Sequence, residues 1–263
     1  MFLAVDVGNT QTTLGLFDDS GAFATGWRMA TDATDTADML HARLWGYFGK
    51  DGFSISDIDS AGVACVVPVL ARAWRKCLSS IMGRKPHVVS PACDYGLEIA
   101  MPDPKQVGAD RIANALAART SYGSPVIVVD FGTATNIDVV DGRGAYRGGT
   151  ISPGLMLSAE TLFSRAAKLS SVPIEAPQTA LGFDTETAMQ SGLVIGAAVQ
   201  AEGLVARIKA ELGIEDAPVI GTGGLARTVG GATDLFDFID PDLTLRGIYE
   251  MSLRVEGSAA ADS

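Results

Sequence analysis

The chain has 263 residues, of which 47% are hydrophobic and 19% are charged. This composition supports packed cores and excludes a mainly disordered chain. A net charge of −11 and an isoelectric point near 4.6 disfavour a nucleic-acid-binding protein, which normally presents a basic surface. The length suits one large domain or two of about 120 to 130 residues, and we expect two.

Cysteine usage and apolar stretches indicate the compartment. Cys65, Cys77 and Cys93 form no Cys-x-x-Cys pair, which disfavours both structural zinc and a disulfide framework. The N-terminus starts in a strand pattern without a basic leader, and the longest apolar stretches fall far below the roughly 18 residues of a membrane span. We therefore expect a cytoplasmic protein that binds neither a membrane nor a nucleic acid.

The first half of the chain indicates three strands followed by helix, strand, helix and strand. Apolar residues at helical spacing, from Leu40 to Phe48, follow the cap candidates Asp35 and Thr36. A second helix is expected over 69–82. The expected strands are 2–5, 12–17, 24–28, 61–67 and 87–90.

The second half repeats this order. The expected strands are 126–129, 136–140, 145–150 and 219–221, and the expected helices are 185–212, 243–255 and one opened by Pro153 with the apolar stripe Leu155, Ala159, Leu162, Phe163, Ala166 and Leu169. We predict a duplicated α/β unit, with domains 1–118 and 119–256, a ligand between them and a flexible tail at 257–263.

Two acidic turns occupy equivalent places in the halves. Asp6-Val7-Gly8-Asn9-Thr10 follows one apolar strand, and Asp130-Phe131-Gly132-Thr133-Ala134-Thr135 follows the other. Glycine lets the backbone approach a ligand, and N–H groups and threonine hydroxyls can converge on phosphate oxygens. A carboxylate beside phosphate requires a cation between them, as Mg²⁺ provides. One such turn alone could be an ordinary hairpin, but two predict a metal-nucleotide site.

Two further segments hold candidate substrate contacts. Asp110 and Arg111 open an alanine-rich helix, where Asp110 either caps the helix or meets an acceptor hydroxyl while Arg111 holds a polar or anionic part of the same molecule. The two roles can coexist, because a carboxylate has two oxygens. Thr185 also opens a helix, and a capping role is the simpler interpretation there. A glycine-rich turn at 221–224 follows a strand and could lie against a nucleotide.

Together these residues resemble the type III pantothenate kinases, a family in the clan of acetate and sugar kinases, heat-shock chaperone ATPases and actin. The resemblance runs from Met1 to about Met251. Its specific pieces are Asp-Val-Gly-Asn-Thr at 6–10, Gly-Ala-Asp-Arg at 108–111, Asp-Phe-Gly-Thr-Ala-Thr at 130–135, Gly-Gly-Thr-Ile-Ser-Pro-Gly at 148–154 and Asp-Thr at 184–185. Where family members often have a tyrosine, this chain has Met101, followed by Pro102-Asp103-Pro104.

The resemblance implies an actin-like fold of two ribonuclease H-like domains, with the active site in the cleft between them. It implies ATP-dependent phosphorylation of pantothenate to 4'-phosphopantothenate, the first step toward coenzyme A, by a homodimer that uses Mg²⁺ and a monovalent cation, K⁺ or NH₄⁺. By motif position, Asp110 is the catalytic residue. The implied ATP-binding residues are Asp6, Val7, Gly8, Asn9, Thr10, Gln11, Thr12, Thr13 and Thr133. The implied pantothenate-binding residues are Gly108, Ala109, Asp110, Arg111 and Thr185, and the implied cation ligands are Asp130 for the monovalent ion and Asp6 for Mg²⁺ through water.

Two alternatives remain. A kinase of the same clan would keep the ATP turns and phosphorylate another small hydroxyl acceptor. A non-catalytic regulator would keep the fold without turnover, although the retention of Asp6, Asp110 and Asp130 favours chemistry. A chaperone ATPase is disfavoured, because no third domain is left to bind clients.

Overall fold

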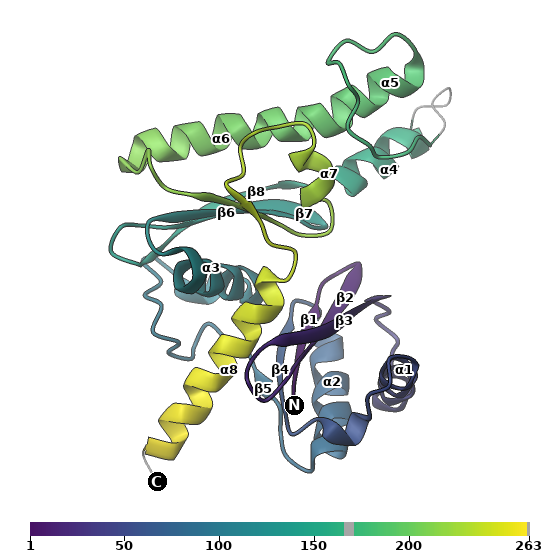
Figure 1. The fold of residues 1–263 in the computed structure, drawn as a ribbon, viewed down its shortest axis with the longest axis vertical. Helices are drawn as coiled ribbons and strands as arrows, with labels where there is room; N and C mark the ends of the chain where they lie inside the picture. Colours follow the sequence, from purple (N-terminus) through teal and green to yellow (C-terminus); the bar gives the residue numbers. More distant parts are fainter. Residues whose placement is uncertain (166–170, 262–263) are drawn as a thin grey trace. The chain divides into compact units, whose positions relative to one another are not determined.

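The computed structural model describes residues 1–165 and 171–261, in two compact units (Figure 1). Unit 1 comprises Met1–Leu97, Pro102–Ala117 and Leu243–Ser263, and unit 2 comprises Glu98–Met101 and Ala118–Asp242. The division at Ala117 and Ala118 falls beside the expected boundary at 118. The units differ from the expected ranges in two places, because Glu98–Met101 belongs to unit 2 and the C-terminal helix belongs to unit 1.

Unit 1 has a five-stranded mixed sheet in the order β3-β2-β1-β4-β5. Strands β1, β2 and β3 are antiparallel neighbours, whereas β4 pairs in parallel with β1 and β5. The predicted succession of strands and helices is confirmed. The elements are β1 Phe2–Val7, β2 Gln11–Phe17, β3 Phe23–Ala30, α1 Ala37–Lys50, η1 Ile55–Asp57, β4 Ser60–Cys65, α2 Pro68–Met82, β5 His87–Val88, η2 Pro104–Gln106, the start of α3 Ala109–Tyr122, and α8 Leu243–Ala261.

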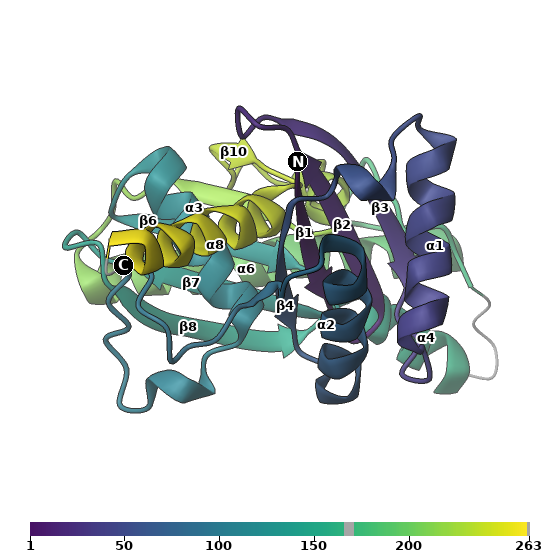
Figure 2. The same ribbon diagram turned by 90° about the horizontal axis from the view of Figure 1, so that it is seen from below.

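The two faces of this sheet are covered by different helices. Helices α1 and α2 lie side by side over one face, as Figure 2 shows, and bury Leu44 and Trp74 against the strands. Helix α8 covers β1 and β4 on the opposite face, where Gly62 leaves room for Ile248 and Ser252. A β-branched or long residue at position 62 would displace α8. The glycine therefore allows the C-terminal helix to pack closely on this sheet, and for that reason the helix is part of unit 1.

Unit 2 repeats the sheet with the order β10-β9-β6-β7-β8. Strand β6 pairs antiparallel with β7 and parallel with β9, as β1 does with β2 and β4. The elements are the end of α3, β6 Val126–Phe131, β7 Ala134–Val140, β8 Tyr146–Pro153, α4 Leu155–Arg165, α5 Thr185–Gln190, a π-helical turn Ser191–Ile195, α6 Gly196–Leu212, β9 Val219–Thr222, α7 Ala226–Gly230 and β10 Phe238–Ile239. A hydrophobic cluster lies on one face, between the sheet and helices that include α6, and residues of the other face, such as Val128 and Tyr146, are buried too.

Several element boundaries differ from the prediction. Pro153 does not open a helix, because it is the last residue of β8 and pairs with Ala134. The expected helix 185–212 contains a π-helical turn at Ser191–Ile195. Helix α8 extends to Ala261, past the expected end at 255 and into the expected tail. Ala166 and Leu169, which were expected on the stripe of α4, lie outside the described residues.

One helical stretch of the described residues, Thr185–Leu212, passes the length and composition test for a membrane span, with a mean hydropathy of 1.3. The uninterrupted apolar runs in the sequence did not reveal it, because the alanines between the larger apolar side chains also raise the mean hydropathy. A single helix of this kind also occurs in soluble proteins, so it assigns no membrane location.

Candidate active site

The first acidic turn joins β1 to β2 in unit 1. Asp6 lies opposite Thr13 in the antiparallel ladder, and the Gly8 N–H donates to the Gln11 carbonyl at 3.0 Å, which closes the turn. Asn9 and Thr10 are exposed at its tip, whereas Asp6 is half-buried. The turn therefore presents backbone and hydroxyl groups to solvent, with a carboxylate at its base.

Thr12 has a different role from its neighbours. Its side chain is completely buried, and its Oγ1 lies 2.9 Å from Oγ1 of Thr31 at the end of β3. The Thr31 N–H also donates to the Thr10 carbonyl at 2.9 Å. These two hydrogen bonds attach the acidic turn to the third strand. The buried Thr12 therefore holds the turn in place from the core side.

Cys65 lies beside this turn, at the end of β4. Its position pairs with Val7, and its Sγ donates to the Val67 carbonyl at 3.1 Å. Burial raises the pKa of the Cys65 thiol, and the negative charge of Asp6 raises it further. The thiol is therefore kept protonated beside the carboxylate.

Asp110 lies in the first turn of α3 but does not cap the helix by the expected geometry. The helix begins at Ala109, and Oδ1 of Asp110 accepts from the N–H of Arg111 at 2.9 Å. The side-chain direction is limited by Gly108, because a Cβ atom at that position would overlap Oδ1 of Asp110. Within the described residues Oδ2 accepts no hydrogen bond, which leaves that oxygen available to a ligand.

Helix α8 connects Asp110 to the strands of unit 1. The Thr244 Oγ1 donates to Oδ1 of Asn114 on α3 at 2.7 Å, and the backbone of Ala113 closely approaches Gly247. The same α8 packs on β1, the strand that carries Asp6. The first turn of α3 and the acidic turn are therefore held on one scaffold.

The second acidic turn belongs to unit 2. Asp130 of β6 is paired with Asn136 of β7 and with Thr222 of β9, so these three side chains form one row on one face of the sheet. Thr222 is 1% exposed, and its Oγ1 has no hydrogen-bond partner within the described part of the chain. The row places carboxylate, amide and hydroxyl oxygens beside one another.

Gly223 fixes the place of Asp130 from the neighbouring turn. Its φ of +90° suits glycine, and a Cβ atom there would overlap Oδ1 of Asp130 and approach the Phe131 backbone. The predicted glycine-rich turn thus lies against the second acidic turn. Sequence reasoning selected Asp130 and this turn but missed Thr222 and Asn136 as row neighbours, because their alignment depends on strand register.

Thr133 and Thr185 occupy exposed positions of unit 2. Thr133 is in the turn after β6, where its carbonyl accepts from the Gly154 N–H at 3.1 Å. Asp184, rather than Thr185, caps α5 through the Thr187 N–H at 2.8 Å, and this bond lowers the pKa of Asp184. The Thr185 hydroxyl is therefore not required by the cap, and it lines a pocket of about 490 Å³.

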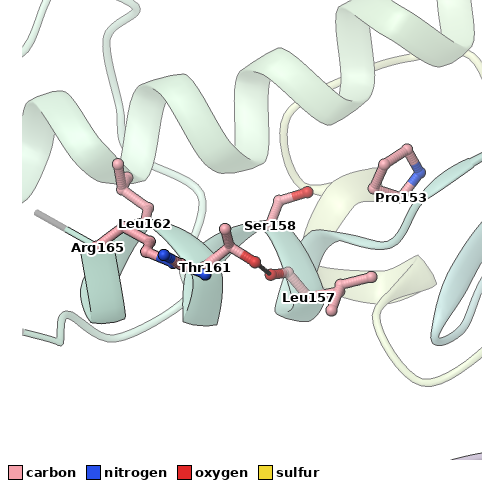
Figure 3. A pocket seen from close by; sticks show the side chains of 6 residues that line it. All are labelled: Pro153, Leu157, Ser158, Thr161, Leu162 and Arg165. Atoms are coloured by element: carbon pink, nitrogen blue, oxygen red, sulfur yellow. Dashed lines mark hydrogen bonds between the residues drawn. The ribbon is translucent and has the colours of Figure 1, made fainter.

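A second, open pocket of about 660 Å³ adjoins α4 (Figure 3). Its lining is largely apolar and includes Leu157 and Leu162, with Arg165 at one end. Leu162 also lines the pocket of Thr185. The two hollows thus share one side chain of α4.

The described residues contain no cluster of three or more His, Cys, Asp or Glu side chains that would by itself hold a metal ion. A nucleotide-bound Mg²⁺ does not need such a cluster, because phosphate oxygens and water supply most ligands around one or two carboxylates. Asp6 fits that arrangement. The Asp130 row, with the unpartnered buried hydroxyl of Thr222, fits a hard cation with oxygen ligands.

Solved structures similar to the chain support the fold. A Campylobacter jejuni protein assigned to the Baf family of transcriptional activators has a TM-score of 0.63 at 18% identity, with 97% of this chain and 99% of that chain covered. The activator of 2-hydroxyisocaproyl-CoA dehydratase from Clostridium difficile, solved with ADPNP, has a TM-score of 0.60 at 14% identity, with 98% and 97% covered. The neighbours are actin-like ATPase folds, in agreement with the predicted duplication.

Sequence comparison identifies the family. A type III pantothenate kinase of Bacillus cytotoxicus is 42% identical over 249 residues, which are 95% of this chain and 94% of that protein. One of Agathobacter rectalis is 42% identical over 248 residues, which are 94% and 95%. The model of the family described as type III pantothenate kinase matches residues 2–207. The chain therefore belongs to the type III pantothenate kinases, and its reaction is the ATP-dependent phosphorylation of pantothenate in coenzyme A biosynthesis.

Proposed function

We propose that Asp110 is the catalytic residue of this phosphoryl transfer and that 4'-phosphopantothenate is the product. The observation that supports this role is the geometry at the start of α3. One carboxylate oxygen accepts a hydrogen bond from the Arg111 N–H at 2.9 Å, and the other accepts none from the described residues. A carboxylate fixed in this way can orient an acceptor hydroxyl with its second oxygen.

The chemistry demands little of the base. Phosphoryl transfer passes through a loose transition state and gains mainly from alignment and charge neutralisation. Oδ2 of Asp110 accepts a hydrogen bond from the primary hydroxyl of pantothenate and takes its proton late, as the new O–P bond forms. The bond between the γ-phosphorus and the β,γ-bridging oxygen breaks, and ADP leaves.

The remaining residues bind the two substrates. The segment Asp6–Thr13 binds ATP, and Thr133 contacts the nucleotide. Within this segment the buried Thr12 contributes by holding the turn in place. Gly108 and Ala109 contact pantothenate at the start of α3. Arg111 suits the pantothenate carboxylate, because a guanidinium can donate two parallel hydrogen bonds to it. Thr185 reaches pantothenate from its pocket.

Cations offset the phosphate charge when bound. Asp6 would hold Mg²⁺ through water, and Asp130, with Thr222 beside it, would hold K⁺ or NH₄⁺. Both sites would suit their cations, because Mg²⁺ prefers oxygen ligands and K⁺ or NH₄⁺ also binds to oxygen atoms, which Asp6 with Thr13 and Asp130 with Thr222 supply.

We also propose that the protein is a cytoplasmic homodimer. Unit 2 exposes large apolar side chains, including Leu157 of α4 at 47%, and Leu181 at 71% and Phe183 at 83% shortly before α5. Where exposed apolar side chains form a contiguous patch, they mark protein interfaces, and a second copy would cover these residues. In a sedimentation experiment, Leu157→Asp combined with Phe183→Asp should give monomers, whereas an unchanged dimer would contradict this interface.

The catalytic proposal is tested by ADP release with Asp110→Asn. This variant should fold and bind ATP normally but lose turnover by a factor of about 100 or more, on the scale of general-base contributions. Asp38→Asn, an exposed change on α1, serves as the matched control and should keep full activity. Near-normal turnover of Asp110→Asn would refute the assignment. Release of ADP without pantothenate, or equal release with another hydroxyl acceptor, would instead contradict the acceptor.

A further inference from the structure

Arg28 lies on the edge strand β3, in line with the first acidic turn. Its position pairs with Thr13, which in turn pairs with Asp6. The neighbours Trp27 and Met29 are buried in the core with α1 and α2. Since side chains alternate along a strand, Arg28 is on the opposite face, together with Thr13 and Asp6.

The distance across this row suits a shared ligand. Neighbouring strands lie about 4.8 Å apart, so the Cα atoms of Arg28 and Asp6 are about two strand spacings from each other. Thr13 occupies the place between them. A guanidinium that extends over Thr13 and a cation held at Asp6 would therefore reach opposite sides of the same phosphate group.

The Arg28 side chain is available for this role. It is exposed, and it makes no ion pair or side-chain hydrogen bond within residues 1–165 and 171–261. Helix α8, which covers β1 and β4 on the same face, makes few contacts with β2 and no substantial contact with β3. The guanidinium is thus beyond the cover of α8.

The backbone of Arg28 is nevertheless well fixed. The preceding Trp27 donates from Nε1 to Oδ2 of Asp51 at 2.6 Å, and the end of β3 is attached to the acidic turn through Thr31. An arginine on a fixed strand loses less freedom on binding than one on a loop. The backbone at position 28 is therefore already fixed before a ligand binds, while the side chain makes no ion pair or hydrogen bond with the described residues.

We propose that Arg28 binds the terminal phosphates of ATP. A planar guanidinium donates paired hydrogen bonds to phosphate oxygens, and this charge-assisted contact is stronger than a neutral one. In a chain of net charge −11, with one of its carboxylates in the acidic turn itself, a fixed positive charge offsets the repulsion between the protein and the triphosphate. The inference rests on the proposed binding of ATP by Asp6–Thr13.

Three variants test this inference through the affinity for different nucleotides. Arg28→Met removes the charge, and Arg28→Lys keeps the charge but loses the paired geometry. Arg75→Met removes one exposed positive charge from α2, on the other face of the sheet. Each purified full-length protein is assayed for the KM of ATP, the KM of pantothenate and the Kd of ATP and AMP.

Arg28→Met should raise the KM and Kd for ATP by about 10- to 100-fold, the range for a hydrogen bond to a charged group. The Kd for AMP and the KM for pantothenate should stay within about twofold. The KM and Kd for ATP of Arg28→Lys should fall between those of the parent and Arg28→Met, and those of Arg75→Met should match the parent. Equal ATP affinity in Arg28→Met and Arg75→Met would overturn the proposal, as would an equal loss of ATP and AMP affinity.

The same assay separates this inference from the ATP site itself. Asn9→Ala changes the exposed tip of the acidic turn. If the turn binds ATP and Arg28 does not, only Asn9→Ala lowers the affinity for ATP. If the turn does not bind ATP, Asn9→Ala leaves ATP affinity unchanged, and both the site and the Arg28 proposal fail.

Discussion

Asp6 and Asp130 occupy the same place in two strands of 6 residues with the same succession of buried and half-buried positions. Each is the half-buried residue before the last position of its strand. Their neighbours differ, however: Asp6 is paired with Thr13 and Ala64, whereas Asp130 is paired with Asn136 and Thr222. The duplicated scaffold therefore presents one row with a carboxylate and one hydroxyl. The other row offers a cation more oxygen ligands, from a carboxylate, an amide and a hydroxyl.

This difference predicts separate cation dependences for the two carboxylates. Asp130→Asn should raise the K⁺ concentration needed for half-maximal activity at least tenfold and leave the Mg²⁺ requirement unchanged. Asp6→Asn should raise the Mg²⁺ requirement instead. Initial rates, measured at combinations of K⁺ and Mg²⁺ concentrations, show which cation requirement each variant changes. The division of roles would be contradicted if both variants shifted the same cation.

Much of the fold follows from local sequence patterns. The apolar runs before Asp6 and Asp130 predicted β1 and β6, and Thr36 caps α1 as expected. Strand ends were less accurate. Both strands continue through the aspartate and one residue further, because ladder pairing extends into residues whose types favour turns.

The functional rows depended on information that the sequence does not hold locally. Thr222 is brought beside Asp130 by parallel pairing of β9 with β6, and Arg28 is brought into line with Asp6 by two antiparallel registers. Motif position selects residues near one another in the chain, whereas register joins residues far apart in it. The packing of α8 on unit 1 is another long-range contact, made possible by Gly62.

Gly108→Ala should reduce turnover without unfolding the protein. The added Cβ overlaps Oδ1 of Asp110, which is the end of a side chain and can rotate away, whereas no backbone atom blocks it. The carboxylate would leave the orientation fixed by the Arg111 N–H. We expect kcat to fall at least tenfold and the free energy of unfolding to change by less than about 1 kcal/mol. Gly46→Ala, at an open helical position, is the control. Full activity of Gly108→Ala would show that this glycine does not direct Asp110.

Gly223→Ala should instead destabilise unit 2. Its φ of +90° is unfavourable for alanine, and the new Cβ would lie 2.7 Å from the backbone N and C atoms of Phe131. Because backbone cannot rotate away, we expect a loss of about 2 kcal/mol or more in the free energy of unfolding, measured by urea denaturation. Gly142→Ala, in the open hairpin after β7, should change stability little. Equal stabilities of these two variants would mean that the glycine-rich turn relaxes freely.

Asp141 gives a stability contribution that depends on pH. Burial of its carboxyl opposes ionisation, but Arg147, 3.0 Å from Oδ2, and the N–H groups of Ala145 and Arg143 outweigh it and lower the pKa of Asp141. A carboxyl whose pKa is lower in the folded state stabilises the protein above its unfolded pKa, near 4. That contribution is lost as the pH falls through the folded pKa.

Asp141→Asn should therefore reduce the free energy of unfolding by about 1 to 3 kcal/mol at pH 7, the range for hydrogen bonds to a charged group. The difference from the parent should shrink steadily as the pH falls below about 4, because the parent carboxyl then becomes protonated. Urea denaturation between pH 7 and pH 3 measures it, with the exposed Asp216→Asn as the matched control. A difference that stayed constant over this range would show that the hairpin is stabilised by the shape of the side chain rather than by its charge.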